Sequence, residues 1–84
     1  MPYKVIIQKR VLKELEKINE PDYSKIKDAI IGLAENPRPH GYKKLKGRDG
    51  YRIRVGDYRI IYEVFDHILS IDVLNLGHRR DIYE

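Results

Sequence analysis

The sequence predicts an α+β fold in which one strand and two helices precede an antiparallel meander of three or four strands. Between residues 9 and 34, apolar side chains recur every three or four positions, which is the period of an amphipathic helix. Between residues 51 and 76, runs rich in β-branched and aromatic residues are separated by short polar turns, which is typical of strands. A chain of 84 residues has room for one modest core, so we expect a single domain over residues 1–84.

The first half of the chain is expected to form a strand and a two-helix hairpin. Residues 3–8 predict the strand, and residues 9–18 predict the first helix. Residues 19–22 interrupt the helical pattern, because Pro21 suits the first position of a second helix. Two prolines after residue 36 end that second helix. The side chains that should face the sheet are Val11, Leu12, Leu15 and Ile18 in the first helix and Tyr23, Ile26, Ile30 and Leu33 in the second.

The second half contains a hairpin whose register can be predicted. Residues 51–55 alternate apolar and basic side chains, and residues 58–64 form a second β-rich run. The pair Gly56-Asp57 between them suits a two-residue turn of type II′, which pairs residue 55 with residue 58. One face would then carry Tyr51, Ile53, Val55, Tyr58, Ile60, Tyr62 and Val64 under the helices, and the other would carry Arg52, Arg54 and Arg59. Residues 42–45 predict a further short strand before the hairpin.

This register sets Arg54 opposite Arg59 on the open face. Like charges directly across a sheet destabilise it by up to about 1 kcal/mol. A bound anion would offset that cost, and phosphate matches the geometry of the guanidinium fork. The alternative is a solvated face on which the arginines turn apart or pair with nearby acids. Residues 43–59 hold seven basic and two acidic side chains, whereas the whole chain has a net charge of +4, so the positive charge is concentrated here.

The last strand is predicted over residues 68–76, after a turn at residues 66–67. A two-residue turn there would set Asp72 across from Ile61 on the open face. We expect Asp72 to form a structural salt bridge with one of the arginines of that face. Gly77 is expected to end the strand and to turn the terminal segment back toward the sheet edge.

The composition excludes several kinds of site. The chain has no cysteine, so it has neither disulfide bonds nor thiolate metal sites. Its three histidines and isolated carboxylates do not form a ligand cluster in the sequence, and we expect no metal and no cofactor. No apolar run approaches the roughly 20 residues of a membrane span, and no signal peptide opens the chain. We therefore expect a cytoplasmic protein without a membrane partner.

Three features make the whole chain resemble the RelE/ParE superfamily, the toxic partners of toxin–antitoxin pairs. The first is the strand–helix–helix start with its break at residues 19–21. The second is Lys-Leu-Lys-Gly at residues 44–47, followed by Tyr-Arg-Ile-Arg-Val at 51–55 and Asp-Tyr-Arg-Ile-Ile-Tyr at 57–62. The third is Gly-His-Arg-Arg-Asp-Ile-Tyr at residues 77–83. The resemblance implies an endoribonuclease that cuts mRNA on the ribosome, contacts 16S rRNA there, and is silenced by a cognate antitoxin that contacts the two helices.

The resemblance also implies the residues that would do this chemistry. The catalytic set is Arg52, Arg54, Arg59, His78, Arg79 and Tyr83. Arg59 matches the phosphate-binding arginine of the family, and Arg79 matches a basic residue of the C-terminal segment. Tyr83 matches a near-terminal tyrosine proposed to act on the nucleophile, and His78 is the alternative acid or base. The other basic residues, which we expect to bind RNA phosphates, are Lys43, Lys44, Lys46, Arg48 and Arg80.

The sequence departs from the family pattern at residues 52 and 54, where the RelE branch often has two lysines. Arginine keeps the charge but scarcely deprotonates, so it removes a proton donor at neutral pH. Cleavage by the RNA 2′-hydroxyl needs a base, positive charge at the transition state and a proton for the leaving 5′-oxygen. Tyr83 would be the base only if Arg59 and Arg79 lowered its pKa well below about 10.

Two other functions stay open from the sequence. One is a ParE-like toxin that inhibits DNA gyrase by binding and cuts no nucleic acid. The other is an RNA-binding module without catalysis. Members of the ParE branch tend to lack the full set of basic residues and tyrosine, so the presence of that set favours the nuclease.

Overall fold

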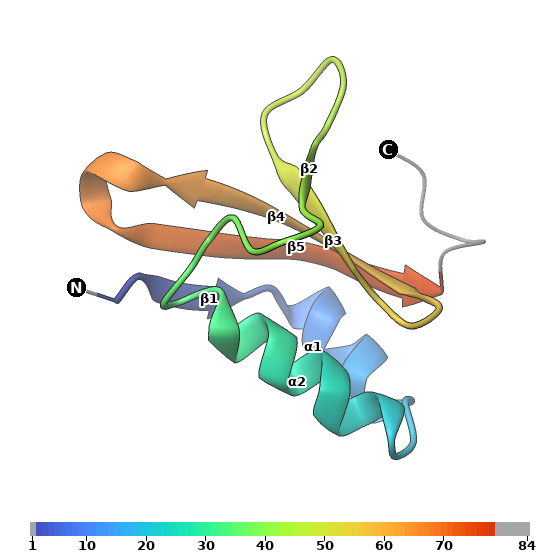
Figure 1. Cartoon of the computed structure of the whole chain (residues 1–84). Coiled ribbons are helices and arrows are strands. Elements are labelled where there is room, and N and C mark those ends of the chain that lie inside the picture. Colours follow the sequence, from blue (N-terminus) through green and yellow to red (C-terminus); the bar gives the residue numbers. More distant parts are fainter. Residues whose placement is uncertain (1, 79–84) are drawn as a thin grey trace.

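The computed structural model describes residues 2–78 and contains one five-stranded sheet with two helices on one side (Figure 1). The elements, in chain order, are β1 (Lys4–Ile7), α1 (Lys9–Glu16), α2 (Asp22–Gly32), β2 (Lys43–Lys44), β3 (Tyr51–Val55), β4 (Tyr58–Phe65), the 3-10 helix η1 (Asp66–Ile68) and β5 (Ser70–His78). The α+β class is confirmed, and the antiparallel meander β2–β5 has four strands.

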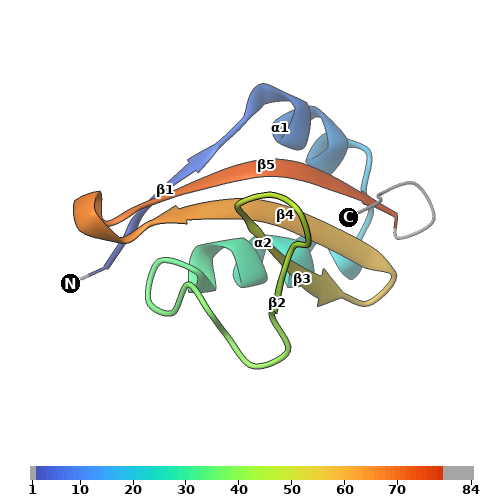
Figure 2. The same ribbon diagram turned by 90° about the horizontal axis from the view of Figure 1, so that it is seen from above.

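The strand order in the sheet is β1-β5-β4-β3-β2, as Figure 2 shows from above. The first strand therefore pairs with the last one, and it runs parallel to it. A parallel pair needs a long crossover connection, and α1 and α2 provide part of that crossover on their way across one face of the sheet. Neither helix is long or apolar enough to cross a membrane, and residues 2–78 contain no other candidate span.

The β3–β4 hairpin has the predicted register in all five pairs, from Val55 opposite Tyr58 to Tyr51 opposite Tyr62. Gly56 in the turn has φ of +59°, a backbone conformation that glycine adopts without steric cost. Because opposed residues share a face, this register places the apolar set under the helices and Arg52, Arg54 and Arg59 on the other face.

The connection from β4 to β5 differs from the prediction. It consists of η1 followed by Leu69, a residue with φ of +50°, so Phe65 pairs with Ser70 rather than with Ile68. Asp72 consequently lies opposite Glu63 instead of Ile61. Its side chain accepts a hydrogen bond of 2.8 Å from Nε2 of Gln8. The expected salt bridge of Asp72 with an arginine is therefore wrong.

A β-bulge changes the alternation of side chains along β5. Tyr62 pairs with Val73 and Ile61 pairs with Asn75, which leaves Leu74 as the extra residue. After the bulge, Leu76 packs in the core with Ile71 and Val73. Gly77 lies inside the strand and not beyond its end, so the turn predicted at Gly77 is also wrong.

The core lies between the sheet and the two helices. Its buried side chains are Val11, Leu15, Ile26, Ile30, Leu33, Ile53, Ile60, Tyr62, Ile71, Val73 and Leu76. Of the residues predicted to face the sheet, Leu12 is 46% exposed. Val11 and Leu15, one helical turn apart, point at the sheet, and Leu12 is 100° further around the helix from Val11 and lies on its flank.

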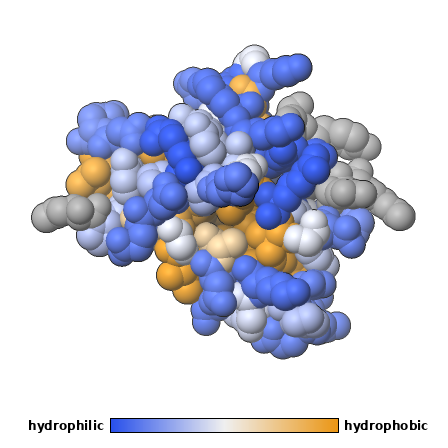
Figure 3. All heavy atoms as spheres, viewed as in Figure 1, coloured by the Kyte–Doolittle hydropathy of each residue, from blue (hydrophilic) through white to orange (hydrophobic). Residues whose placement is uncertain are grey.

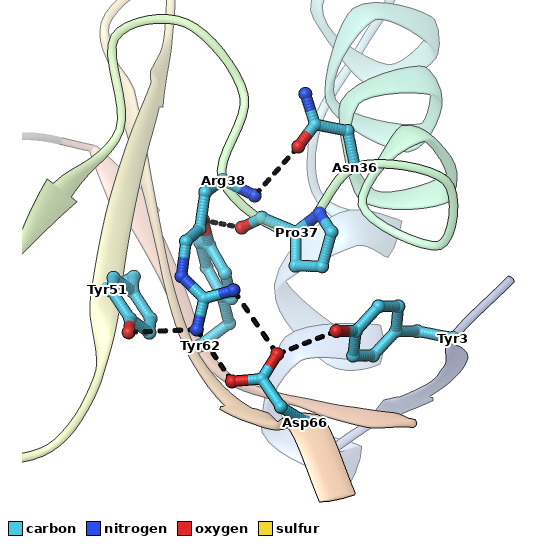
Figure 4. A network of polar contacts seen from close by, with 7 residues as sticks. All are labelled: Tyr3, Asn36, Pro37, Arg38, Tyr51, Tyr62 and Asp66. Carbon is cyan, nitrogen blue, oxygen red and sulfur yellow. Dashed lines mark hydrogen bonds and ion pairs between the residues drawn. The ribbon is translucent and has the colours of Figure 1, made fainter. Parts of the chain in front are cut away.

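A network of polar side chains ties the loop after α2 to the far end of the β4–β5 hairpin (Figure 4). The Arg38 guanidinium donates two hydrogen bonds to the Asp66 carboxylate, at 2.8 and 3.2 Å, and one of 3.2 Å to the Tyr51 hydroxyl. It also lies 5.1 Å from the centre of the Tyr51 ring. The Tyr3 hydroxyl donates to the same carboxylate at 2.6 Å. Four segments of the chain are thereby joined at one point.

Gly50 is predicted to be the most sensitive glycine of the β2–β3 loop. Its φ is +136°, and an added Cβ would lie 3.2 Å from Cδ1 of Leu45 and 3.3 Å from the carbonyl oxygen of Tyr62. Gly50→Ala should lower the free energy of unfolding by about 2 kcal/mol, measured by urea denaturation. Gly47→Ala is the matched control: its φ is +70° and nothing lies within 4 Å of an added Cβ, so it should cost about 1 kcal/mol. Equal losses in the two variants would contradict this account.

The Arg38–Asp66 pair is predicted to make the free energy of unfolding fall more steeply as the pH drops below about 4. Hydrogen bonds from Arg38 and Tyr3 lower the pKa of Asp66 from 3.8 to about 2. Because the folded-state pKa is the lower one, this contribution is present above about pH 4 and is lost as the pH falls toward 2. In Asp66→Asn, the urea midpoint should therefore change less between pH 4 and pH 2 than in the wild type.

Asp28→Asn, an exposed change on α2, is the control and should follow the wild-type curve. Added salt should reduce the difference, because the pair is partly exposed. Parallel curves for the wild type and Asp66→Asn at low salt would show that the pair adds no pH dependence.

Candidate RNA-binding and catalytic site

Four basic side chains form one patch on the sheet face that the helices leave uncovered. Lys43 of β2 lies opposite Arg52, and Arg54 lies opposite Arg59. Side chains directly across an antiparallel pair lie roughly 5 Å apart on the same face. Arg52 and Arg54 are two residues apart on β3 and also share that face. We call Lys43, Arg52, Arg54 and Arg59 the sheet-face patch.

The arginines of the patch differ in burial. Arg52 is only 3% exposed, Arg59 is half-buried and Arg54 is exposed. The Nε atoms of Arg52 and Arg59 are both buried. Each of the three arginines makes at least one polar, ring or electrostatic contact. Arg52 and Arg59 are thus held by their surroundings, and Arg54 reaches into solvent beside them.

The uncovered face is less open than predicted, because it contains a small apolar cluster of its own. Leu45 and Ile61 are each 3% exposed and pack against one another. Ile61 is the residue opposite Arg52, so the cluster borders the patch. The Leu45 backbone N–H also donates to the carbonyl of Gly50 at 3.0 Å. These contacts anchor the loop that carries Lys46 and Arg48, both of which are exposed.

Gly77 is the neighbour of Arg59 on β5. It is buried within the strand and has no side chain to place beside the guanidinium. Gly77 therefore contributes only backbone, and no side chain of its own, beside Arg59 at this border of the patch. A single glycine in a strand is a known sign of close approach by another group, and this signal is visible in the sequence.

Two predicted site residues lie away from the patch. Lys44 is opposite Tyr51 on the helix side, with its Nζ atom 5.8 Å from the centre of that ring. His78 is opposite Tyr58, and the two rings meet edge to face with centroids 5.7 Å apart. Because Tyr58 packs against the core, His78 shares the helix side of the sheet and not the side of Arg54. Arg79, Arg80 and Tyr83 lie outside the residues that the structure describes.

Two tyrosines of the described chain can be set aside as proton acceptors. Burial raises the pKa of Tyr62 to about 12, and its hydroxyl donates to the carbonyl oxygen of Pro37 at 2.7 Å. The hydrogen bond to Asp66 raises the pKa of Tyr3 as well. Both hydroxyls stay protonated at neutral pH and have structural partners. Within residues 2–78, no three His, Asp or Glu side chains are grouped as a metal ion would require.

Comparisons with known proteins identify the family of this chain. Residues 5–83 match the family model described as the ParE toxin of the type II toxin–antitoxin system parDE. The chain is 35% identical to the putative toxin RelE1 of Methanocaldococcus jannaschii over 88 residues, covering 100% of this chain and 98% of that protein. It is 30% identical to the mRNA interferase toxin RelE of Escherichia coli over 83 residues, covering 95% of this chain and 86% of that protein.

The structural comparison gives the same family. The crystal structure of the archaeal RelE–RelB complex from Pyrococcus horikoshii contains a chain that superposes with a TM-score of 0.85 and 34% identity, covering 98% of this chain and 100% of that chain. The isolated RelE toxin of E. coli superposes with a TM-score of 0.76 and 29% identity, covering 90% of this chain and 83% of that chain. This chain therefore belongs to the RelE/ParE superfamily of toxins from type II toxin–antitoxin systems.

Proposed function

We propose that this protein is a RelE-type toxin: a ribosome-dependent endoribonuclease that cleaves mRNA and is neutralised by a cognate antitoxin. The observation that carries the proposal is the sheet-face patch, in which Arg54 lies directly opposite Arg59 with Arg52 beside them. Two relatives, from E. coli and Shigella flexneri, are named mRNA interferases. We place the activity in the cytoplasm, where ribosomes translate mRNA.

The patch suits the phosphate at the scissile bond. During 2′-hydroxyl attack, negative charge builds on the non-bridging phosphate oxygens, and fixed cations that meet this charge lower the barrier. Arg59, half-buried on a central strand, needs little reorganisation to do so. A phosphate between Arg54 and Arg59 would also offset the repulsion between the two guanidinium groups. DNA lacks the 2′-hydroxyl and would not be cut by this route.

The proton transfers must come from other groups, because guanidinium does not exchange protons at neutral pH. We assign the base to Tyr83 and propose that Arg79 supplies further positive charge to the reaction. His78 is the alternative. The contact of His78 with Tyr58 on the helix side of the sheet favours Tyr83 over His78.

The other basic residues are proposed to position the RNA. Lys43 extends the patch, and Lys46 and Arg48 are exposed on the loop that Leu45 anchors. These loop residues suit contacts with mRNA or 16S rRNA phosphates away from the scissile bond. Arg80 and Lys44 complete the proposed set, but Lys44 lies on the helix side of the sheet and would contact a phosphate away from the patch.

A second candidate is inhibition of DNA gyrase by binding. The observation that favours it is the family model, whose description names a ParE toxin. A third candidate, an RNA-binding module without catalysis, would use the same patch. Both are separated from the nuclease by the test below, because neither produces new mRNA ends.

Arg59→Ala is predicted to slow cleavage strongly while leaving the fold intact. The purified protein would be added to a cell-free translation reaction, and the 5′ ends of the mRNA mapped. Loss of a fixed cation at the transition state should slow cleavage by about 100-fold or more. Lys13→Ala on the exposed face of α1 is the control and should cut like the wild type. Intact mRNA with the wild-type protein and active ribosomes would contradict the nuclease proposal. An assay of DNA gyrase supercoiling would then test the second candidate.

Tyr83→Phe is predicted to lose most of its cleavage rate but to keep its affinity for ribosomes, because it removes a proton acceptor and no basic side chain. His78→Gln, tested beside it, should retain activity. Rates come from single-turnover cleavage on stalled ribosomes, and affinity comes from co-sedimentation. Full activity in Tyr83→Phe together with a loss of activity in His78→Gln would show that His78, and not Tyr83, is the base.

A further inference from the structure

The short strand β2 forms the edge of the sheet beside the sheet-face patch. Its two residues, Lys43 and Lys44, are both exposed, and their side chains point to opposite faces of the sheet. Lys43 lies on the face of the patch, opposite Arg52, and Lys44 lies on the helix side, opposite Tyr51. Within residues 2–78, neither lysine forms an ion pair with a carboxylate. Figure 3, in the same view as Figure 1, shows hydrophilic residues gathered around β2 and the β2–β3 loop. Positive charge therefore continues from the patch around this edge.

Tyr42 directly precedes β2 and adds an aromatic ring on the helix side of the same edge. The residue is 39% exposed. Its ring packs against Tyr51 with centroids 5.8 Å apart and an angle of 62° between the ring planes. Its backbone N–H donates to the carbonyl oxygen of Pro39 at 3.0 Å, and the residue after it is already part of the sheet. The ring is thus presented to solvent from a fixed stretch of backbone.

The support for this ring is also fixed. The Tyr51 hydroxyl accepts a hydrogen bond from Arg38, whose guanidinium lies 5.1 Å from the centre of the Tyr51 ring and is itself held by Asp66 (Figure 4). A ring that is positioned before a ligand arrives loses little conformational freedom on binding. We call Tyr42, Lys43 and Lys44 the β2-edge platform.

The far end of the uncovered face has the opposite charge. Glu63 lies directly across from Asp72 on that face. Glu63 is four residues along β4 from Arg59, a distance of roughly 13 Å at the rise of a strand. Lys4 shares this face but lies opposite Ser70, one step beyond Asp72, so it does not stand between the carboxylates and the patch. A nucleic-acid backbone that left the patch in this direction would meet two carboxylates, whereas at β2 it would meet two ammonium groups.

A fixed ring beside two lysines suits single-stranded RNA. Every nucleobase has a π-face that can stack on an aromatic side chain, and lysines beside the ring can hold the phosphates on either side of that base. Duplex RNA keeps its bases stacked on one another and cannot offer one to Tyr42. The platform therefore favours an unpaired strand.

Resting on the proposed function, we infer that the mRNA strand leaves the sheet-face patch over the β2 edge, where one of its bases stacks on Tyr42. Lys43 and Lys44 hold its phosphates on the two sides of the edge. This path gives Lys44 a contact with RNA although it faces away from the arginines. The scissile phosphate stays at Arg54 and Arg59, so the platform positions the strand and takes no part in breaking the bond.

Tyr42→Leu tests this inference, because leucine keeps apolar bulk beside Tyr51 but has no π-face. The probe is a short fluorescent 2′-O-methyl oligouridine, which the 2′-hydroxyl route cannot cut, titrated at low salt without ribosomes. Loss of one stacked base should weaken binding by about 10-fold. Tyr42→Phe and Tyr42→Trp keep the ring and should bind like the wild type. Phe65→Leu is the matched control: Phe65 is 36% exposed on the same strand as Glu63, and its loss should leave the affinity unchanged.

An abasic oligomer of the same length separates stacking from charge, because it keeps the phosphates and lacks the bases. Tyr42→Leu should bind this oligomer as well as the wild type does. Lys44→Ala should weaken both oligomers equally and should reduce the slope of log affinity against log salt by about 0.7, the share of one phosphate contact on a single strand. Circular dichroism and urea unfolding confirm that the variants are folded. Equal losses for both oligomers in Tyr42→Leu would overturn the inference, and so would wild-type affinity of Tyr42→Leu for the oligouridine or a wild-type chain that does not bind it.

On stalled ribosomes, Tyr42→Leu should raise the protein concentration that gives half-maximal cleavage and leave the rate at saturation unchanged, as expected for a positioning residue. 4-Thiouridine placed in the mRNA beside the cut should crosslink to the wild type more than to Tyr42→Leu. Equal crosslinking, with the half-maximal concentration still raised, would assign the ring to 16S rRNA and overturn the mRNA path.

The oligomer titration is independent of the nuclease test. A chain whose oligouridine affinity depends on the ring of Tyr42 but that cuts no mRNA would reject the proposed cleavage and keep the platform as an RNA-binding site. A chain that cuts mRNA, and does so with the same half-maximal concentration in Tyr42→Leu, would reject the platform and keep the nuclease.

Discussion

The two-residue turn at Gly56-Asp57 sets the constraint on which the rest of the molecule depends. Because it fixes which residues of β3 and β4 are opposed, it decides the face of every side chain on both strands. A slip of one residue would send Arg52 and Arg54 into the core and bring Ile53 and Val55 out. The same register that builds the apolar core therefore forces two arginines against each other on the opposite face. The core and the proposed active site cannot be changed independently.

The parts of the fold that could be predicted are those governed by local chemistry. The helices follow from the spacing of apolar residues, and the β3–β4 register follows from one glycine in the turn. The β4–β5 connection could not be derived in this way, because Leu69 adopts a conformation that glycine or asparagine would normally signal. The bulge at Leu74 has no residue that marks it. The place of β1 depends on a partner more than sixty residues away, which no local pattern reveals.

The candidate site also has a part that could be predicted from the sequence and a part that could not. The shared face of Arg52, Arg54 and Arg59 follows from the hairpin alone. The burial of Arg52 and the Leu45–Ile61 cluster do not, because they depend on how the β2–β3 loop folds back over the sheet. The Arg38–Asp66 network joins residues 28 positions apart, and from the sequence Arg38 is only part of a helix end between two prolines. The strand register also separates residues that the composition groups together. Lys44 belongs to the basic run, but it pairs with Tyr51 and therefore lies on the helix side of the sheet.

The parallel pairing of β1 with β5 has a consequence for how the molecule assembles. Each helix can begin to form from contacts along its own segment, but the surface on which α1 packs is β5, the last of the described strands to be synthesised. The sheet closes only when two distant parts of the chain meet, which gives the fold a high contact order and slows its formation. During synthesis, the apolar sides of β1 and α1 therefore lack their main packing surface until β5 has been made. This topology delays the native state until β5, the strand that completes the sheet, has emerged from the ribosome.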